Sequence, residues 1–442
     1  MKRGLSLIVS AILCISMLAG CAGKNASQAS TSSQATASGS EEQSEKKIKL
    51  TYCSWMTKGE DKVTNENFMS ANKNIEVETV ALDGTQYDTL LRTKVLAGNA
   101  PDVFIATAAQ REAFVTDNYL MEIKDIPAIE NLLAKFELLD KNSRTNGKLY
   151  GFPMSPNADI DQVYYNKNYF KEKGFKVPAT TEEFEKLLAD IKADGKEPIV
   201  VGGKDAWTSN AFAKSFTKAL NLSKYDGIEF DRKLLAGEVK MSDYYKEAFE
   251  NWESYVKKGY VSPASVSLTY DQSVQYFADG KAALLAQGPW IAGMENVTGA
   301  KNMDLGAFLM SVPQVDGKRY IAASASTFLV VSSKTADPDA AMKLLEYWTT
   351  PEVLKEYGDR TGSPSLYPVD YTISPVLEDV EKSKAAADVV MDFGGQLSKI
   401  PQGVYDETQT SMVNIIAGST AKDELERIDA LFEKTKSIMK ID

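Results

Sequence analysis

The chain has 442 residues, of which 43% are hydrophobic and 25% are charged, proportions typical of a soluble globular protein. Its 61 Asp and Glu against 50 Lys and Arg give a formal net charge of −11, which argues against binding to nucleic acid and against adhesion to anionic lipid. It contains no histidine, so the commonest general base and the commonest transition-metal ligand are missing, and a catalytic site would have to use carboxylates, Lys or Tyr.

The N-terminus has the features of a secretory signal peptide. Lys2 and Arg3 precede an apolar run, residues 5–18, that is too short for a good transmembrane span. The run ends in Leu-Ala-Gly-Cys, which resembles the bacterial lipobox, in which the cysteine is acylated and the peptide before it is removed. We therefore expect residues 1–20 to be a lipoprotein signal peptide and Cys21 to be a lipid anchor on the extracytoplasmic face of a cell membrane. The alternative is an ordinary cysteine near a conventional cleavage site.

A polar segment, residues 22–46, follows Cys21. It consists almost wholly of Ser, Ala, Thr, Gln, Gly, Lys and Glu, and it cannot bury enough surface to offset its ordering entropy. The sequence therefore predicts a flexible tether over residues 21–46. Because Cys14 leaves with the signal and Cys21 is lipidated, Cys53 has no partner, and no disulfide framework is expected.

The folded body begins at residue 47 with alternating strand and helix patterns. The sequence predicts strands at residues 48–52, 75–80 and 103–106 and helices at residues 62–72 and 87–97. The continuous apolar run at 103–106 is typical of a strand buried in a parallel sheet. This alternation predicts an α/β fold.

Further elements follow along the rest of the chain. Thr180 or Thr181, with Glu183, is expected to begin a helix that ends at Gly195. The sequence also predicts an aromatic strand within residues 150–166, strands at residues 199–201, 282–286, 305–312 and 326–331, and helices at residues 243–257, 338–349 and 421–440.

Four stretches carry a resemblance to a known family. They are LAGNAPDVFIA at residues 96–106, YYNKNYF at 164–170, FADGKAALLAQGPW at 277–290 and DPDAAMKLLEYWTTPE at 337–352. Together they resemble the family 1 extracellular solute-binding proteins, the sugar-binding proteins of ABC importers typified by maltose-binding protein. The resemblance covers the chain from residue 47 to the C-terminal helix. It implies a two-lobed periplasmic-binding-protein-like fold of type II, in which each lobe is a mixed sheet flanked by helices and a multi-segment hinge joins the lobes.

The resemblance also implies lobe boundaries. The N-terminal lobe is expected to comprise residues 47–158 and 290–350, and the C-terminal lobe residues 159–289 and 351–442. The crossings between the lobes would then fall near residues 159–163, 286–289 and 349–352. Ligand would lie in the cleft between the lobes, and their closure would create the shape that a membrane permease recognises.

Sugar sites combine planar aromatic rings with hydrogen-bonding side chains, and ligands of open α/β sheets lie beyond the carboxyl ends of strands. Trp207 and Trp290 match positions at which the resemblance implies an aromatic platform, and Tyr405 matches a region that lends an aromatic in some relatives. The full set of candidate ligand-binding residues is Trp55, Lys58, Gln110, Asn157, Asp159, Asp161, Trp207, Trp290, Ser326 and Tyr405.

Some candidates have an ordinary structural interpretation as well. Trp55 could cap the core under a turn, and Asn157, Asp159 and Asp161 could be loop caps. At Thr107, Ala109 and Gln110, directly after the strand at residues 103–106, this chain lacks the acidic residue that the resemblance implies for maltose-type relatives, which argues against a maltodextrin ligand.

We therefore expect a non-enzymatic, monomeric binding lipoprotein of an ABC importer that delivers a mono- or oligosaccharide to permease subunits, without cofactor, metal or nucleic acid. A binding protein for a polyamine or a peptide is the main alternative, and iron is disfavoured because there is no histidine. A surface glycosidase with Asp159 and Asp161 as acid and base, and a structural adhesin, are further alternatives. The polar tether favours a Gram-positive surface over a periplasm.

Overall fold

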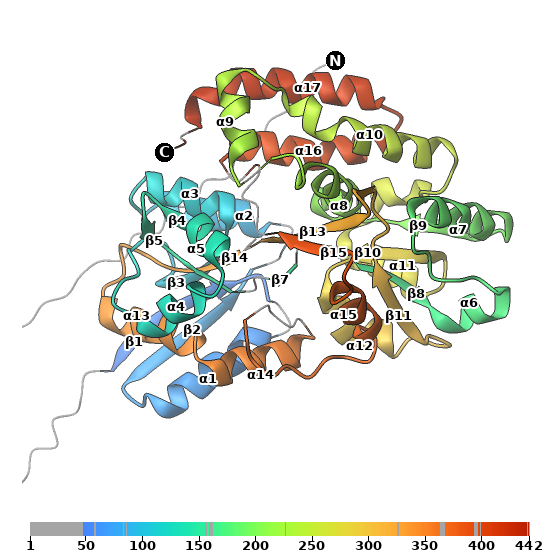
Figure 1. Cartoon of the computed structure of the whole chain (residues 1–442). Helices are drawn as coiled ribbons and strands as arrows, with labels where there is room; N and C mark the ends of the chain where they lie inside the picture. The colour runs from blue at the N-terminus through green and yellow to red at the C-terminus, as the bar shows by residue number, and fades with distance from the viewer. Residues whose placement is uncertain are drawn as a thin grey trace, which may run out of the picture. The chain divides into compact units, whose positions relative to one another are not determined.

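Two β-sheets, each flanked by helices, organise the folded body in a computed structural model (Figure 1). The structure describes residues 47–56, 59–82, 84, 86–154, 157–158, 162–225, 227–324, 327–362, 367–392, 397, 399–439 and 441. Residues Lys46–Asp442 form one compact unit.

The first sheet has five strands in the order β2-β1-β3-β14-β6. They are β1 (Ile48–Ser54), β2 (Ile75–Ala81), β3 (Val103–Thr107), β14 (Thr327–Val331) and β6 (Phe152–Pro153). β1 pairs in parallel with β2 and β3, whereas β14 runs antiparallel to β3 and β6. The sheet is therefore mixed, with a late segment of the chain inserted beside early strands.

Several helices and short strands accompany the first sheet. They are α1 (Glu60–Ala71), α2 (Tyr87–Leu96), α3 (Ala108–Thr116), α4 (Pro127–Leu133), α5 (Glu137–Ser143), α13 (Pro338–Trp348), α14 (Pro351–Thr361), β4 (Arg144–Thr145) and β5 (Lys148–Leu149). Apolar positions on α13 at helical spacing, Ala341, Leu344, Leu345 and Trp348, are buried in the same core cluster as Leu50, Phe68 and Val103. We call this sheet with its helices the first lobe.

The second sheet has four strands in the order β11-β8-β10-β9. They are β8 (Gln162–Asn166), β9 (Glu197–Val200), β10 (Ala282–Gln287) and β11 (Leu305–Leu309). β8 runs antiparallel to both β10 and β11, while β9 and β10 are parallel. The beginning of β8 and the ends of β9, β10 and β11 therefore meet at one edge of this sheet.

The other helices of the described residues belong with the second sheet, which together with them forms the second lobe. They are α6 (Lys167–Lys173), α7 (Thr181–Ala193), α8 (Asn210–Asn221), α9 (Glu229–Ala236), α10 (Met241–Lys257), α11 (Tyr270–Ala278), α12 (Glu295–Thr298), α15 (Glu378–Lys384), α16 (Gln402–Ile416) and α17 (Ala421–Thr435), with 3₁₀ turns η1 (Ala206–Thr208), η2 (Pro263–Ser267), η3 (Pro289–Gly293) and η4 (Lys436–Ile438).

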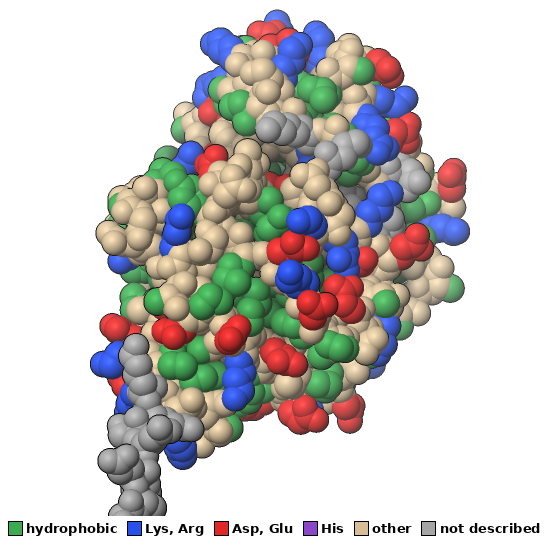
Figure 2. Space-filling model, turned by 90° about the vertical axis from the view of Figure 1, so that its left-hand side faces the viewer, with side chains coloured by type: hydrophobic (Ala, Val, Ile, Leu, Met, Phe, Trp, Pro, Cys, Tyr) green, Lys and Arg blue, Asp and Glu red, His purple; other side chains and the backbone are tan. Residues whose placement is uncertain are grey.

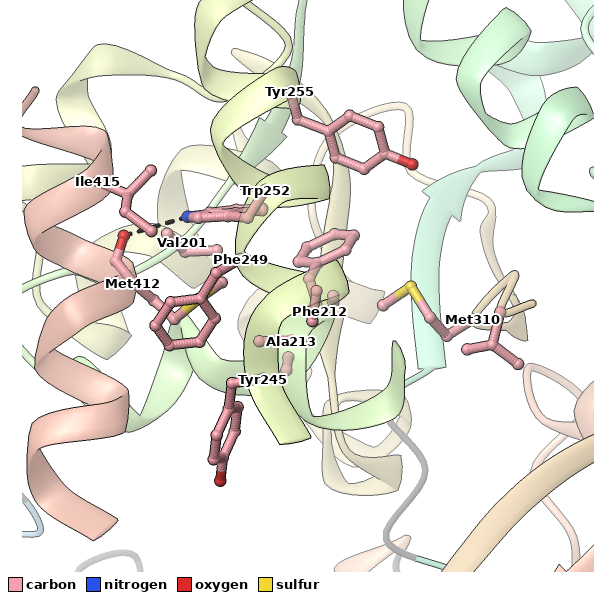
Figure 3. Packing of buried hydrophobic residues seen from close by; sticks show 14 of the residues in the cluster. Val201, Phe212, Ala213, Tyr245, Phe249, Trp252, Tyr255, Met310, Met412 and Ile415 are labelled. Carbon is pink, nitrogen blue, oxygen red and sulfur yellow. Dashed lines mark hydrogen bonds between the residues drawn. The ribbon is translucent and has the colours of Figure 1, made fainter. Parts of the chain in front are cut away.

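The helical core of the second lobe is rich in aromatic side chains (Figure 3). Phe212 of α8 stacks on Trp252 of α10, with ring centroids 5.3 Å apart. The Trp252 indole N–H donates to the backbone carbonyl of Met412 on α16 at 3.1 Å, so the polar atom of this buried ring is satisfied. This core fixes α16 against α8 and α10.

A third, small sheet lies between the two larger ones in Figure 1. β13 (Lys318–Ser324) pairs with β12 (Gln314–Val315), β15 (Val389–Asp392) and β7 (Asn157–Ala158). The chain passes from the first sheet to the second between β6 and β8, and returns between β11 and β14. These crossing segments are the link between the two lobes.

The α/β fold and its mixed sheets are confirmed, but two predicted boundaries are wrong. β11 pairs with β8, and Ile291 and Val297 pack in one cluster with Tyr164, so residues 290–309 belong to the second lobe and no crossing occurs at 286–289. α14 packs in the first core through Val353, Leu354 and Tyr357, so residues 351–361 stay with the first lobe, and the predicted crossing at 349–352 is also wrong. In both places the apolar side chains continue into the core of the lobe that precedes them.

Candidate functional site

Three aromatic side chains of the second lobe gather near the sheet edge at which β9 and β10 end. The ring centroids of Trp207 and Tyr270 are 5.1 Å apart, and those of Trp207 and Trp290 are 6.3 Å apart. The Trp290 indole N–H donates to the Tyr270 hydroxyl at 2.9 Å. We call Trp207, Tyr270 and Trp290 the aromatic cluster.

Glycines allow the close approaches that build the aromatic cluster. A Cβ on Gly288 would overlap the Trp290 ring, which folds back over this glycine. A Cβ on Gly202, just after β9, would lie 2.7 Å from the Thr269 carbonyl oxygen, so this glycine lets the loop of Trp207 meet the start of α11. Gly288 therefore allows the Trp290 ring to fold back, and Gly202 allows the start of α11, with Tyr270, to approach the loop of Trp207.

Hydrogen bonds hold the same loops in place. The Asp205 carboxylate, which is buried, accepts from the backbone N–H of Tyr270 at 2.5 Å. The Tyr164 hydroxyl donates to the Gly288 carbonyl at 2.9 Å and fixes the turn that leads to Trp290. The cluster therefore rests on buried polar contacts that require no ligand.

The two tryptophans of the cluster remain open to solvent. Trp207 is 41% exposed and Trp290 is 36% exposed, although both belong to the most readily buried kind of side chain. Neighbouring exposed aromatic rings are a costly feature for a water-soluble surface, which makes this cluster the candidate site.

On the first lobe, two predicted residues, Trp55 after β1 and Gln110 on α3, contact the first residues of α2. Trp55 is half-buried and meets the Tyr87 ring edge-on, with centroids 5.0 Å apart. Gln110 is buried and forms a capping box with Thr107, and its amide N–H donates to the Asp88 carboxylate at 2.9 Å. Both side chains are thus engaged in local structure, and Gln110 positions Asp88.

Two carboxyl groups, Asp88 on α2 of the first lobe and Asp406 on α16 of the second lobe, have raised pKa values. Desolvation, with the charge of Asp406 on α16 as the second cause, raises the pKa of the Asp88 carboxyl. Desolvation also raises the pKa of Asp406, against the lowering effects of a hydrogen bond from Gln402 and of the Arg92 charge. Both carboxylates are exposed to solvent, so the desolvation comes from protein on several sides and not from full burial. α16, which carries Asp406, packs against the 3₁₀ turn that carries Trp207.

The remaining predicted residues divide into two groups. Tyr405 is half-buried on α16 and packs against the core of the second lobe. The backbone of Asn157 lies in β7, opposite Ser324 of β13, in the crossing region. The side chain of Asn157 and the residues Lys58, Asp159, Asp161, Ser326 and Cys21 lie outside the described part of the chain.

Three residues of the site were not predicted, namely Tyr270, Asp88 and Asp406. Tyr270 begins α11 after the capping box of Thr269 and Gln272, a signal that predicts a helix start but no binding role. Asp88 and Asp406 lie on helices far apart in sequence, and only the fold brings their charges together. No signal in the sequence alone could have found that pair.

The described residues offer Asp and Glu side chains as possible metal ligands and contain one cysteine. Within those residues, no group of three or more Cys, Asp and Glu side chains is suited to hold a metal ion. Cys53 is a free thiol in the core, where burial raises its pKa to about 11. No helix within the described ranges is long and apolar enough to span a bilayer.

The family model of the bacterial extracellular solute-binding proteins matches residues 65–386, most of the folded body. The chain belongs to this family. Members of this family act outside the cytoplasm in solute binding. The two lobes and the solvent-exposed aromatic cluster of the second lobe agree with such a role.

Characterised family members are similar along most of their length. The multiple sugar-binding protein of Streptococcus mutans is 26% identical over 302 residues, covering 68% of this chain and 70% of that protein. The maltodextrin-binding protein MdxE of Bacillus subtilis is 26% identical over 363 residues, covering 78% of this chain and 76% of that protein.

Solved structures of solute-binding proteins share the fold. RafE of Streptococcus pneumoniae in complex with raffinose superposes with a TM-score of 0.71 at 21% identity, covering 88% of this chain and all of that one. A sugar transporter protein of Bacillus licheniformis in complex with stachyose gives a TM-score of 0.67 at 20% identity, with 88% and 100% of the chains covered. The two-lobed type II architecture expected from the sequence is confirmed.

Proposed function

We propose that this protein captures a mono- or oligosaccharide between its two lobes and delivers it to the permease of an ABC importer. The observation that carries the proposal is the aromatic cluster of Trp207, Tyr270 and Trp290, which presents two exposed indole rings. The C–H faces of a pyranose ring stack on such surfaces, while its hydroxyls need hydrogen-bonding groups at the rim.

Two carboxylates support the same assignment. Asp88 and Asp406 each use one carboxylate oxygen to accept from a neighbouring amide, Gln110 at 2.9 Å and Gln402 at 2.6 Å. We expect the other oxygen of each to accept from a sugar hydroxyl. Charge-assisted hydrogen bonds of this kind are about twice as strong as neutral ones and give orientation as well as affinity.

The relatives support an oligosaccharide within this class. The proteins similar to this chain include structures in complex with raffinose and stachyose and relatives named for binding maltodextrin and multiple sugars. The absence at Thr107, Ala109 and Gln110 of the acidic residue expected for maltose-type proteins argues against a maltodextrin.

The protein acts in this proposal as a monomeric, lipid-anchored binder and not as an enzyme. Lipidation of Cys21 and removal of residues 1–20 would leave the folded body on the residue 21–46 tether, beside its permease. The surface supports a solute as the ligand in preference to nucleic acid, because Figure 2 shows acidic and basic side chains interspersed on one face without a continuous basic area.

One observation favours a second candidate, a polyamine. The charge of Asp406 raises the pKa of Asp88 across the two lobes, so an ammonium group bound near both carboxylates would stabilise them, and an aromatic wall suits the methylene chain. The same site therefore has to be tested with cationic ligands.

A thermal-shift screen of residues 47–442 separates these candidates. The panel contains raffinose, stachyose, maltotriose, xylo- and chito-oligosaccharides, spermidine, a mixed tripeptide and ferric ion. A ligand that binds only the folded state stabilises it by about 2.7 kcal/mol at a hundred times its dissociation constant. We expect a saturable shift with one sugar class, whereas a shift with spermidine alone would replace the sugar by a polyamine.

A further inference from the structure

An ion pair joins the two lobes. The Lys399 ammonium lies 3.5 Å from a carboxylate oxygen of Glu112. Glu112 is on α3 of the first lobe, and Lys399 precedes α16 of the second lobe. The two side chains are only 22% and 20% exposed, so the contact is partly shielded from water.

The first lobe holds Glu112 in a fixed position. The same carboxylate oxygen accepts from the Thr145 hydroxyl at 2.8 Å and from the Arg111 guanidinium. Arg111 is buried, lies 4.4 Å over the Phe328 ring and also donates to the Ser143 carbonyl. Glu112 is therefore oriented before Lys399 approaches.

The second lobe holds Lys399 in a fixed position as well. The buried Asp231 carboxylate on α9 accepts from the backbone N–H of Leu397 at 2.6 Å and from that of Lys399 at 3.1 Å. Leu397 has a left-handed backbone, with φ at 61°, a conformation that needs such support in a residue with a branched side chain. The loop that carries Lys399 is thus fastened to α9.

The contribution of the Glu112–Lys399 ion pair depends on how far its two partners are held in place before it forms. A mobile surface ion pair contributes little, because two long side chains lose freedom when it forms. Here the Glu112 side chain and the Lys399 backbone are each held by their own lobe, so less freedom is lost than in a mobile surface pair, and the contact exists only while the lobes are close together. An interaction present in one of two states shifts the equilibrium between them.

We propose that Glu112 and Lys399 form a latch that stabilises the closed arrangement of the lobes and thereby raises the affinity for ligand, an inference that rests on the proposed function. Opening of the cleft breaks the latch, and closure re-forms it. Asp231 is the positioning residue, and its removal would free Lys399 without changing either charge of the pair.

The test uses Lys399→Met in residues 47–442, because this change keeps the length of the side chain and leaves Arg111 paired with Glu112. Small-angle X-ray scattering of the ligand-free protein measures the separation of the lobes. We expect a larger radius of gyration in Lys399→Met than in the wild type and an unchanged unfolding midpoint. High salt should expand the wild type toward the same value and leave the variant unaffected.

Ligand affinity is the second readout. If the thermal-shift panel yields a binding sugar, its dissociation constant should rise about two- to fivefold in Lys399→Met and in Glu112→Gln, and the double variant should be no worse than either single one. Lys186→Met is the matched control, because its 2.5 Å pair with Asp190 lies within α7 of a single lobe and should affect neither readout.

The outcomes separate the latch from the proposed function. A wild-type protein that binds no sugar, together with expansion in Lys399→Met, would refute the proposed ligand and keep the latch. Scattering curves and affinities that are the same in Lys399→Met, Lys186→Met and the wild type would refute the latch and leave sugar binding standing.

Discussion

Trp290 of the aromatic cluster packs against its neighbours and is also exposed to solvent. Trp290 donates to Tyr270 and covers Gly288, yet about a third of its surface, 36%, stays open. A ring held in this way loses little freedom when a ligand stacks on it, which makes it an efficient anchor. Its removal should therefore harm binding more than folding.

Trp290→Ala should weaken sugar binding by about 2 kcal/mol, or roughly 30-fold, because the stacking surface is lost. Isothermal titration of the sugar found in the panel measures this change. Trp290→Phe is the matched control, since it keeps a ring and loses only the hydrogen bond to Tyr270, and it should retain most of the affinity. Equal affinity in Trp290→Ala and the wild type would remove the cluster from the site.

Asp231 makes stability depend on pH in a definite direction. Desolvation raises the pKa of this buried carboxyl from 3.8 to about 6, against the lowering effect of its hydrogen bonds from Lys399 and Leu397. Because the folded pKa lies above the unfolded value, the contribution to stability is fully present below about pH 4 and is lost as the pH rises through about 6.

Asp231→Asn removes that titration. Between pH 4 and pH 7, the unfolding free energy of the wild type should fall relative to that of the variant. The expected fall is on the order of 3 kcal/mol, which corresponds to about two pKa units. Urea unfolding at four pH values measures it. A difference that stays constant over this range would contradict the raised pKa.

At the scale of elements, the local signals predicted most helices and strands well. Periodicity predicted β1, α2, β3, α10 and α13 to within a few residues, because each has a continuous buried stripe. The prediction for 421–440 was too long, since α17 ends at Thr435 and a 3₁₀ turn follows. Short or crossing elements such as β13 depend on partners distant in sequence and carry no strong period of their own.

The structure of the start of α7 decides whether Thr180 or Thr181 caps this helix. The Thr180 hydroxyl accepts from the backbone N–H of Glu183 at 3.2 Å, so Thr180 and not Thr181 is the N-cap. Thr180→Ala should lower the unfolding free energy by about 1 kcal/mol. Thr181→Ala, one residue inside the helix, is the control and should change it by less, as urea denaturation can measure. The reverse order would assign the cap to Thr181.

The turn after β10 offers a test of orientation that leaves the tryptophan in place. Gly288→Ala puts a methyl group where the Trp290 ring lies, while the backbone at this position, with φ at −71°, accepts alanine. The ring must turn away, so sugar affinity should fall at least tenfold, about 1.4 kcal/mol, with a small change in melting temperature. Near-ultraviolet circular dichroism should report the displaced indole, and unchanged affinity would show that its orientation is irrelevant.

At the scale of the whole molecule, the sequence predicted two lobes but misassigned segments to them. The resemblance implied the architecture, whereas the boundaries depend on which core receives Ile291 and Val353, and both cores are equally apolar in sequence. The candidate site depends on assembly in the same way: the family resemblance implied Trp207 and Trp290, whereas the charge of Asp406 acts on Asp88 only because the fold brings the two lobes together.

The most direct test of capture between lobes is a sugar titration of residues 47–442 followed by small-angle X-ray scattering. The account predicts that the radius of gyration decreases and saturates at the sugar concentration that saturates the thermal shift, because the ligand is held by side chains of both lobes. A scattering curve that stays unchanged while the thermal shift is saturated would contradict capture by closure, and a panel without any binding sugar would contradict the proposed ligand.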